Sequence, residues 1–183
     1  MARIDVIPLD KMTPEQRRVN DFIAAKRHGG QARGPFGIWL RNPVLAEKAA
    51  IFGDYVRDEL SIDRKLAELA ILAIARHYTA QYEWFAHERH ARAAGIEDAT
   101  IEAIRNGKTP DLPDEKMAAT YAMTKEILDT NAVSDATYDR ALKALGEVEL
   151  VELGTTIGFY SMVAMMLVTF LVDVPEGPDP LPV

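Results

Sequence analysis

Three ionisable residues near the middle of the chain have the types and spacing that acid–base chemistry requires. The first is Glu68, the only charged residue in the run from Leu66 to Ala75. A helix that is apolar on every side is buried, and an ionised carboxylate on it is costly unless it is paired, hydrogen-bonded or protonated. Glu68 is therefore predicted to have a partner. That partner is either a proton-transfer group or a purely structural one, such as an arginine or a helix N-terminus.

The other two residues are Glu83 and His87, which lie four positions apart. On a helix this spacing places both side chains on one face, where they can meet. A carboxylate beside an imidazole fixes the tautomer and raises the pKa of the imidazole, which favours proton transfer. The alternative is an ordinary pair on a solvated helix face. Tyr82 and Trp84, which flank Glu83 with large apolar surface, make that alternative less favourable.

A metal site is a further alternative, because His90 lies about one turn beyond His87 and could join it and Glu83 as a third ligand. The charged residues Glu88 and Arg89 indicate that this end of the helix is solvated, and helical zinc sites usually take ligands from more than one element. We therefore expect neither a metal nor another cofactor.

Composition excludes several classes of function. The 183 residues include no cysteine and carry a formal charge of −7, from 21 Lys and Arg against 28 Asp and Glu. Without cysteine there are no disulfides, thiolate metal sites or cysteine nucleophiles. The acidic balance argues against a nucleic-acid partner, which would need a basic surface. Residues 1–5 do not begin a secretory signal, so the expected location is cytoplasmic.

The pattern along the chain predicts an all-α fold, because no segment alternates with the period of a strand. Thr13-Pro14 and Asn42-Pro43 are typical helix starts. An aromatic loop is expected over 31–42, and breaks at Gly95 and Gly146. The expected division is an N-terminal helical extension (1–33), a helical domain (34–173) and a proline-rich arm (174–183). Helices are predicted over 13–28, 43–57, 61–75, 78–94, 98–106, 114–130, 134–145 and from 147 to about 172.

The stretch from Ile157 to Val172 is the most apolar in the chain. It is shorter than the roughly 18 to 20 apolar residues that a membrane span needs. Glu149 and Glu152 continue its helical pattern towards the N-terminus and would be unfavourable in lipid. A helix buried by protein is the better interpretation, and no membrane is expected.

The segment from Glu68 through Tyr82-Glu83-Trp84-Phe85-Ala86-His87 to Gly95-Ile96 resembles the carboxymuconolactone decarboxylase superfamily, which includes alkylhydroperoxidase D. The resemblance extends from about Gly34 to Ile104. It implies an alkylhydroperoxidase D-like helical bundle that assembles as a homotrimer or homohexamer.

The resemblance also limits the chemistry. The alkylhydroperoxidase D branch has a Cys-x-x-Cys pair whose positions align with Ala80 and Glu83 here, so the dithiol reaction cannot run in this chain. A peroxidase description would then be inherited from the family without its chemistry. The decarboxylase branch has no such pair and retains a Glu and a His, which match Glu68 and His87.

By this resemblance the chain is expected to be a carboxy-lyase, or an enzyme of a related lyase or isomerase step, acting on a small lactone or organic acid of aromatic catabolism. Glu68, Glu83 and His87 would be catalytic, with His87 delivering the proton. The predicted substrate-binding residues are Tyr82, Trp84, Arg41 and Arg76, the arginines for a substrate carboxylate. A catalytically silent binding or assembly protein on the same scaffold stays open.

Overall fold

Every regular element within residues 2–27, 30–175 and 181–182, which the computed structural model describes, is a helix. The predicted all-α fold class is therefore confirmed. After a short 3-10 helix, η1 (Leu9–Lys11), come α1 (Pro14–Lys26), α2 (Pro35–Trp39), α3 (Pro43–Asp58), α4 (Arg64–His77), α5 (Gln81–Ala93), α6 (Asp98–Arg105), α7 (Glu115–Thr130) and α8 (Asp135–Thr169).

Most helix boundaries follow the local signals. Thr13 and Gln16 form a capping box at the start of α1, and the Asn42 side chain accepts from the Leu45 N–H at the start of α3. Two predictions were wrong. The 31–42 segment contains the short helix α2. The start of α4 is capped by Asp63, because Ser61 instead donates its backbone N–H and its hydroxyl to a carboxylate of α8.

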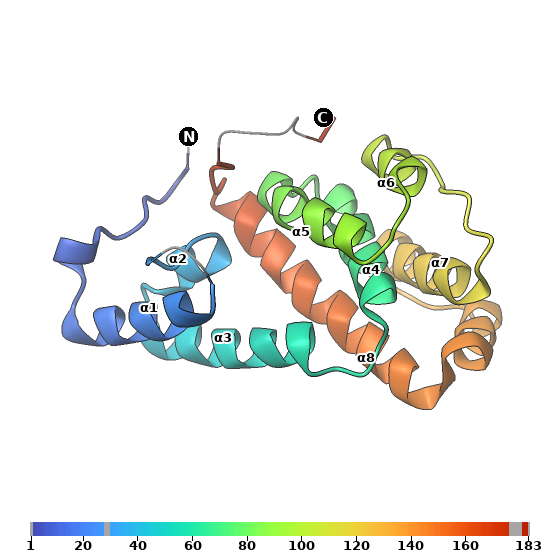
Figure 1. Cartoon of the computed structure of the whole chain (residues 1–183), viewed down its shortest axis with the longest axis horizontal. Helices are drawn as coiled ribbons and strands as arrows, with labels where there is room; N and C mark the ends of the chain where they lie inside the picture. The colour runs from blue at the N-terminus through green and yellow to red at the C-terminus, as the bar shows by residue number, and fades with distance from the viewer. Residues whose placement is uncertain (1, 28–29, 176–180, 183) are drawn as a thin grey trace.

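Helix α4 is the centre of the molecule, and it packs against α5, α6, α7 and α8. All ten residues from Leu66 to Ala75 are buried, including the fully enclosed Glu68. This agrees with a helix that is apolar on every side. Figure 1 shows α4 and α5 beside the long, sloping α8, with α1 to α3 at one end of the molecule and α6 and α7 at the other.

Helix α8 is 35 residues long and contains a break at Gly146, whose φ of 78° and ψ of 171° are not helical. The break was predicted, because glycine adopts a positive φ at little cost. By length and composition α8 could cross a membrane, as many core helices of soluble proteins could. One face of it packs against α4 and α7. The opposite face leaves Val148, Val151, Met162 and Met165 exposed.

The two ends of the chain are tied to this body. Helix α1 packs against α3, so the predicted extension is joined to the rest of the fold. Residues 176–180 and 183 of the predicted arm lie outside the described residues. Leu181 is 1% exposed, and its backbone exchanges two hydrogen bonds with the Gln81 side chain, of 2.6 and 3.0 Å. This contact fixes a point near the C-terminus at the start of α5.

Candidate active site

Glu68 and His87 meet between α4 and α5. The His87 Nδ1 lies 2.9 Å from Glu68 Oε2, and Glu68 Oε1 forms an ion pair with Arg64, one turn earlier on α4. The buried carboxylate thus has both kinds of partner that the sequence left open, an arginine and an imidazole. Two partners of positive or protonatable character are what an ionised carboxylate in this position needs.

Glu83 approaches the other side of the same ring. Its Oε1 lies 3.6 Å from His87 Nε2, and its side chain is only 4% exposed. Within the described part of the chain this oxygen has no hydrogen-bond partner. Burial raises the pKa of Glu83 to about 7, although the charge of His87 acts in the opposite direction; the nearby Glu68 adds to the rise. Near neutral pH, Glu83 therefore exists in both protonation states.

The imidazole is held between these two acids. Burial alone would lower the pKa of His87, but the hydrogen bond and charge of Glu68, together with the charge of Glu83, outweigh it and raise that pKa. Because Glu68 is also paired with Arg64, the His87 Nδ1–H is assigned as the donor to Glu68, which directs Nε2 towards Glu83. This arrangement fixes the tautomer and leaves one nitrogen for proton transfer.

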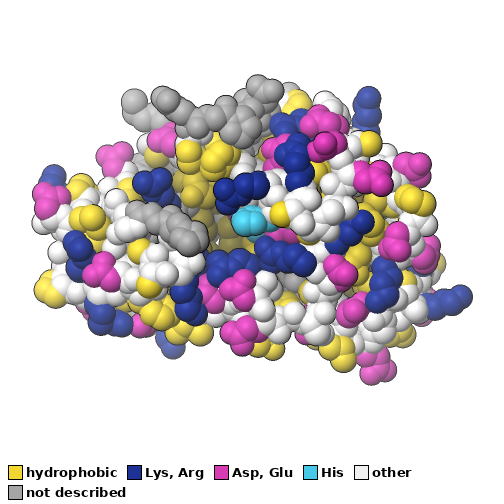
Figure 2. All heavy atoms as spheres, in the orientation of Figure 1, with side chains coloured by type: hydrophobic (Ala, Val, Ile, Leu, Met, Phe, Trp, Pro, Cys, Tyr) yellow, Lys and Arg dark blue, Asp and Glu magenta, His cyan; other side chains and the backbone are white. Residues whose placement is uncertain are grey.

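A cavity of about 280 Å³ opens beside Glu83 and His87. Figure 2 shows this region as a hollow with hydrophobic side chains, next to a histidine with Lys and Arg side chains on either side of it. The cavity is assembled from the N-terminal segments and from α3, α5 and α8. Its lining residues are Arg27, Gln31, Arg33, Pro35, Phe36, Gly53, Arg57, Tyr82, Glu83, Ala86, His87, His90, Phe159, Tyr160 and Val163.

Tyr82 is the one predicted substrate-binding residue that lines this cavity. Its ring passes so close to Gly34 that a Cβ at that position would lie 2.6 Å from the ring, and the φ of +59° at Gly34 also favours glycine. Burial raises the pKa of the Tyr82 hydroxyl, so it stays protonated. The loop before α2 therefore fixes the position of a hydrogen-bond donor at the cavity.

The other three predicted substrate-binding residues do not line this cavity. Arg41 donates to the backbone oxygens of residues 5 and 37, and Arg76 contacts Thr79. Trp84 is 2% exposed and faces away from the cavity, where its indole N–H donates to Glu88 at 3.0 Å. Sequence proximity to Glu83 was misleading for Trp84, because adjacent residues on a helix point in directions about 100° apart.

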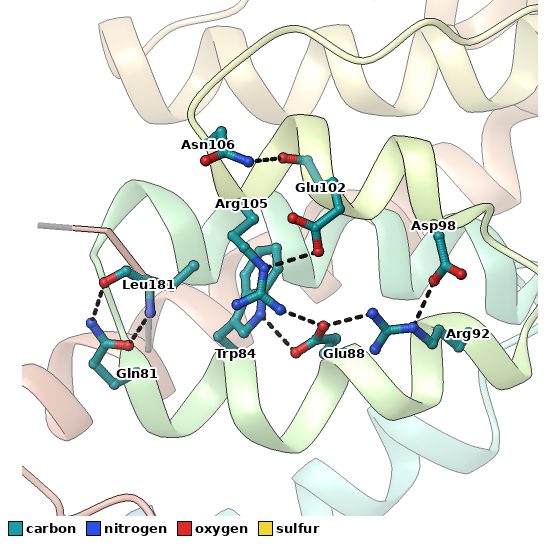
Figure 3. Close-up of polar contacts among 9 residues, drawn as sticks. All are labelled: Gln81, Trp84, Glu88, Arg92, Asp98, Glu102, Arg105, Asn106 and Leu181. Atoms are coloured by element: carbon teal, nitrogen blue, oxygen red, sulfur yellow. Dashed lines mark hydrogen bonds and ion pairs between the residues drawn. The ribbon is translucent and has the colours of Figure 1, made fainter. Parts of the chain in front are cut away.

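Glu88 and Trp84 belong to a separate polar network between α5 and α6, drawn in Figure 3. Glu88 accepts from Trp84 and also forms ion pairs with Arg92 and Arg105. The Arg105 guanidinium lies 5.2 Å from the centre of the Trp84 ring. Of the two residues from which a solvated helix end was predicted, Arg89 is exposed as expected, whereas Glu88 is buried in this network.

Tyr160 is a cavity residue that the sequence interpretation missed. Its ring meets the His87 ring edge-on, with 5.0 Å between their centres. Burial raises the pKa of its hydroxyl, which therefore stays a neutral donor. No local signal distinguishes it, because it lies in the apolar stretch of α8 that reads as core. Only the packing of α8 against α5 brings it to the site.

The metal alternative depends on a cluster of ligands. Over residues 2–27, 30–175 and 181–182 there is no group of three or more His, Asp or Glu side chains arranged to hold a metal ion. His90 lines the cavity, but its ring centre is 5.8 Å from that of His87. Burial and the neighbouring His87 lower the pKa of His90. The described side chains do not converge on a metal position.

These features define an all-helical protein that holds one histidine between two buried glutamates beside a small cavity. No protein-family model and no curated protein matches the sequence. Solved structures do match, and the fold is that of the alkylhydroperoxidase AhpD core and peroxidase-related proteins, as the sequence resemblance predicted. No cysteine is present to supply the dithiol of the peroxidase branch.

Two of these structures cover nearly the whole chain. One is an uncharacterized peroxidase-related protein with an alkylhydroperoxidase AhpD core from Ralstonia eutropha JMP134. It has 14% identity and a TM-score of 0.77, covering 96% of this chain and 93% of its own. The other is an uncharacterized peroxidase-related protein from Silicibacter sp. TM1040. It has 11% identity and a TM-score of 0.76, covering 96% and 92% of the two chains.

Proposed function

We propose that this chain is a cofactor-free acid–base enzyme of the carboxymuconolactone decarboxylase type, a carboxy-lyase for a small lactone or organic acid. One observation carries the proposal: His87 is bound through Nδ1 to Glu68, while its Nε2 faces Glu83 at the wall of a cavity. A related lyase or isomerase step would use the same groups, because both reactions pass through an enolate that must be protonated.

The proton transfer follows from the geometry. When a substrate carboxylate leaves as CO2, the electron pair of the broken carbon–carbon bond enters a conjugated enolate. His87 Nε2–H then protonates the enolate carbon, and the neutral imidazole regains its proton from solvent or from Glu83. Glu68 stabilises the imidazolium and holds the ring orientation, as a positioning residue. The Tyr82 and Tyr160 hydroxyls are neutral donors available to the enolate oxygen.

Peroxidase chemistry of the dithiol type is the alternative that the names of the solved structures suggest. It requires a thiolate that attacks the peroxide and a second thiol that resolves the product. This chain contains neither. We therefore expect no hydroperoxide-dependent oxidation of a dithiol donor, and such an activity, measured with the full chain, would contradict the proposal.

The decisive test is a pair of substitutions, Glu83→Gln and His87→Asn, assayed for turnover on a panel of small lactone acids. We expect losses of about a hundredfold or more in kcat, with little change in melting temperature. His77→Asn is the matched control, because His77 pairs with Asp129 far from the cavity. Full activity in His87→Asn, or a parent that turns over no lactone acid while both variants are destabilised, would favour the catalytically silent scaffold.

We also propose that the chain assembles as a homotrimer or homohexamer. The apolar side chains that α8 leaves exposed support this, and α3 exposes Ile51 and Phe52 as well. Contiguous apolar surface of this kind is usually covered by a partner. Light scattering at the mass of a single 20.3 kDa chain would contradict the assembly but not the chemistry.

A further inference from the structure

Three arginines that the sequence interpretation did not select line the same cavity as Glu83 and His87. Arg27 is the C-cap of α1, Arg33 precedes α2, and Arg57 lies in the last turn of α3. The acid–base groups come from α4 and α5. The cavity is therefore built with a cationic side from the N-terminal helices and a proton-transfer side from the central ones.

Two carboxylates hold Arg27 and Arg57 in place on the cationic side. Asp54, which is 3% exposed, forms ion pairs with Arg27, with Lys26 at 3.2 Å and with Arg57 at 3.5 Å. Arg57 is also held by Asp58, at 2.6 Å. Arg27 and Arg57, the two of these cations that line the cavity, are thus matched by two carboxylates, and Lys26 is not part of the lining.

Arg33 adds a further cation at the same wall. It is exposed, and it has no hydrogen bond or ion pair with any of the residues that the structure describes. Its charge lowers the pKa of the Tyr82 hydroxyl, against the larger effect of burial. The guanidinium is therefore near Tyr82 and available to a ligand.

Arg27 is held in place but incompletely satisfied. Its guanidinium lies over the Phe36 ring, 4.2 Å from the ring centre, and its Nη2 binds Asp54. Its Nη1 is buried, and within the described ranges no acceptor reaches it. A buried donor without an acceptor is costly, so a small rotation that turned Nη1 towards a bound anionic oxygen would gain a charge-assisted hydrogen bond.

The remaining wall is aromatic. Phe36, Tyr82, Phe159 and Tyr160 line it, and Gly53 lets the Phe159 ring approach α3: a Cβ on Gly53 would lie 2.7 Å from the ring. The volume of about 280 Å³ is at the lower end for small-molecule sites. Aromatic rings around a small space favour a planar ring, which can stack on one of them, over a puckered or branched group.

We propose that Arg27 and Arg33 form a carboxylate subsite, and that the cavity binds a planar, conjugated acid with its carboxylate on these arginines and its ring against Phe36 and Phe159. This inference rests on the proposed function for its place in the reaction, since the bound carboxylate would be the one that the substrate keeps. The binding itself needs no turnover and is tested separately.

The test is equilibrium binding to the full chain by isothermal titration calorimetry, with benzoate as the planar acid. Benzamide is the neutral isostere, and cyclohexanecarboxylate is the puckered acid. We expect benzoate to bind about tenfold more tightly than benzamide, the size of one charge-assisted contact. A smaller preference, of about threefold, is expected over cyclohexanecarboxylate.

Two variants identify the subsite. Arg33→Gln should weaken benzoate about tenfold and benzamide less than about twofold. Arg27→Lys keeps a cation beside Asp54 but removes Nη1, and should weaken benzoate to a similar extent. Arg41→Gln is the matched control, because this arginine lies outside the cavity. Melting temperatures within a few degrees of the parent verify that each variant is folded.

The outcomes separate this inference from the proposed function. Benzoate binding that is lost in Arg33→Gln and retained in His87→Asn supports the subsite, even where no lactone acid is turned over. Equal affinity for benzoate and benzamide, no benzoate binding below about 10 mM, or an equal effect of Arg41→Gln overturns it. Turnover that depends on His87 would still stand in that case.

Discussion

Two faces of α5 bury a glutamate, and they do so in opposite ways. Glu83 and Glu88 are 3% and 5% exposed. Glu88 has both oxygens engaged, by the Trp84 indole and by Arg92 and Arg105 (Figure 3). Glu83 Oε1 has no hydrogen-bond partner among the described residues, and it lies beside a histidine and a cavity. Burial alone therefore does not indicate function, whereas an unsatisfied acid at a cavity does.

The largest effect on stability is expected from Glu88, whose two carboxylate oxygens both have partners. Glu88→Ala would remove the acceptor of the buried Trp84 indole N–H and one of the carboxylates that pair with Arg92 and Arg105, which we expect to lower the free energy of unfolding by about 3 kcal/mol. Turnover per folded molecule should change less than about twofold. Urea denaturation with active-site assays measures both. Glu102→Ala is the control, since its side chain is 52% exposed and should cost at most about 1 kcal/mol. Equal losses of stability in the two variants would show that the buried Glu88 contributes no more to folding than the exposed Glu102.

For Glu83 we expect instead an effect on the free energy of unfolding that depends on pH. Because the pKa of Glu83 is about 7 in the folded chain and near 4.5 otherwise, the folded state holds this proton more tightly. Its contribution to stability is complete below pH 4.5 and is lost as pH rises towards 7. Glu83→Gln lacks this loss, so its stability relative to the parent should increase from pH 4.5 to 8, by up to about 3 kcal/mol. A difference that is independent of pH would place the pKa of Glu83 in its ordinary range.

Glu68→Gln tests the role of Glu68 through the pKa of His87. The hydrogen bond and charge of Glu68 raise the pKa of His87 against the effect of burial, so their removal should lower that pKa. NMR titration of the His87 ring measures this without a substrate, and His87→Asn assigns the signal. We also expect a decrease in turnover of about tenfold, from the loss of a fixed tautomer. An unchanged His87 titration would show that Glu68 has a structural role only.

The smallest effect is expected from Trp84→Phe. The change keeps the packed ring and removes the 3.0 Å hydrogen bond to Glu88, which should cost about 1 kcal/mol. Because Trp84 faces away from the cavity, KM and kcat should stay within about twofold of the parent. Thermal denaturation and steady-state kinetics provide the measurements. A large change in KM would restore the original prediction that Trp84 binds substrate.

The cluster of Glu68, Glu83 and His87 was predictable because its sequence signals are local. A single acid in an apolar run must be buried and paired, and a spacing of four residues places Glu83 and His87 on one face. Consecutive helices joined by a short turn then pack together, which brings Glu68 to His87. The cap at Thr13 and the break at Gly146 are local in the same sense.

The sequence by itself determined the helical class, the absence of a cysteine pair and the grouping of Glu68, Glu83 and His87. The tertiary structure alone decided which arginines reach the cavity, which aromatic rings line it and that Trp84 belongs to another network. The reason is physical. Helical periodicity relates residues within a few turns, whereas Arg27, Arg57 and Tyr160 come together only when α3 packs against α1 and α8, and α8 packs against α5.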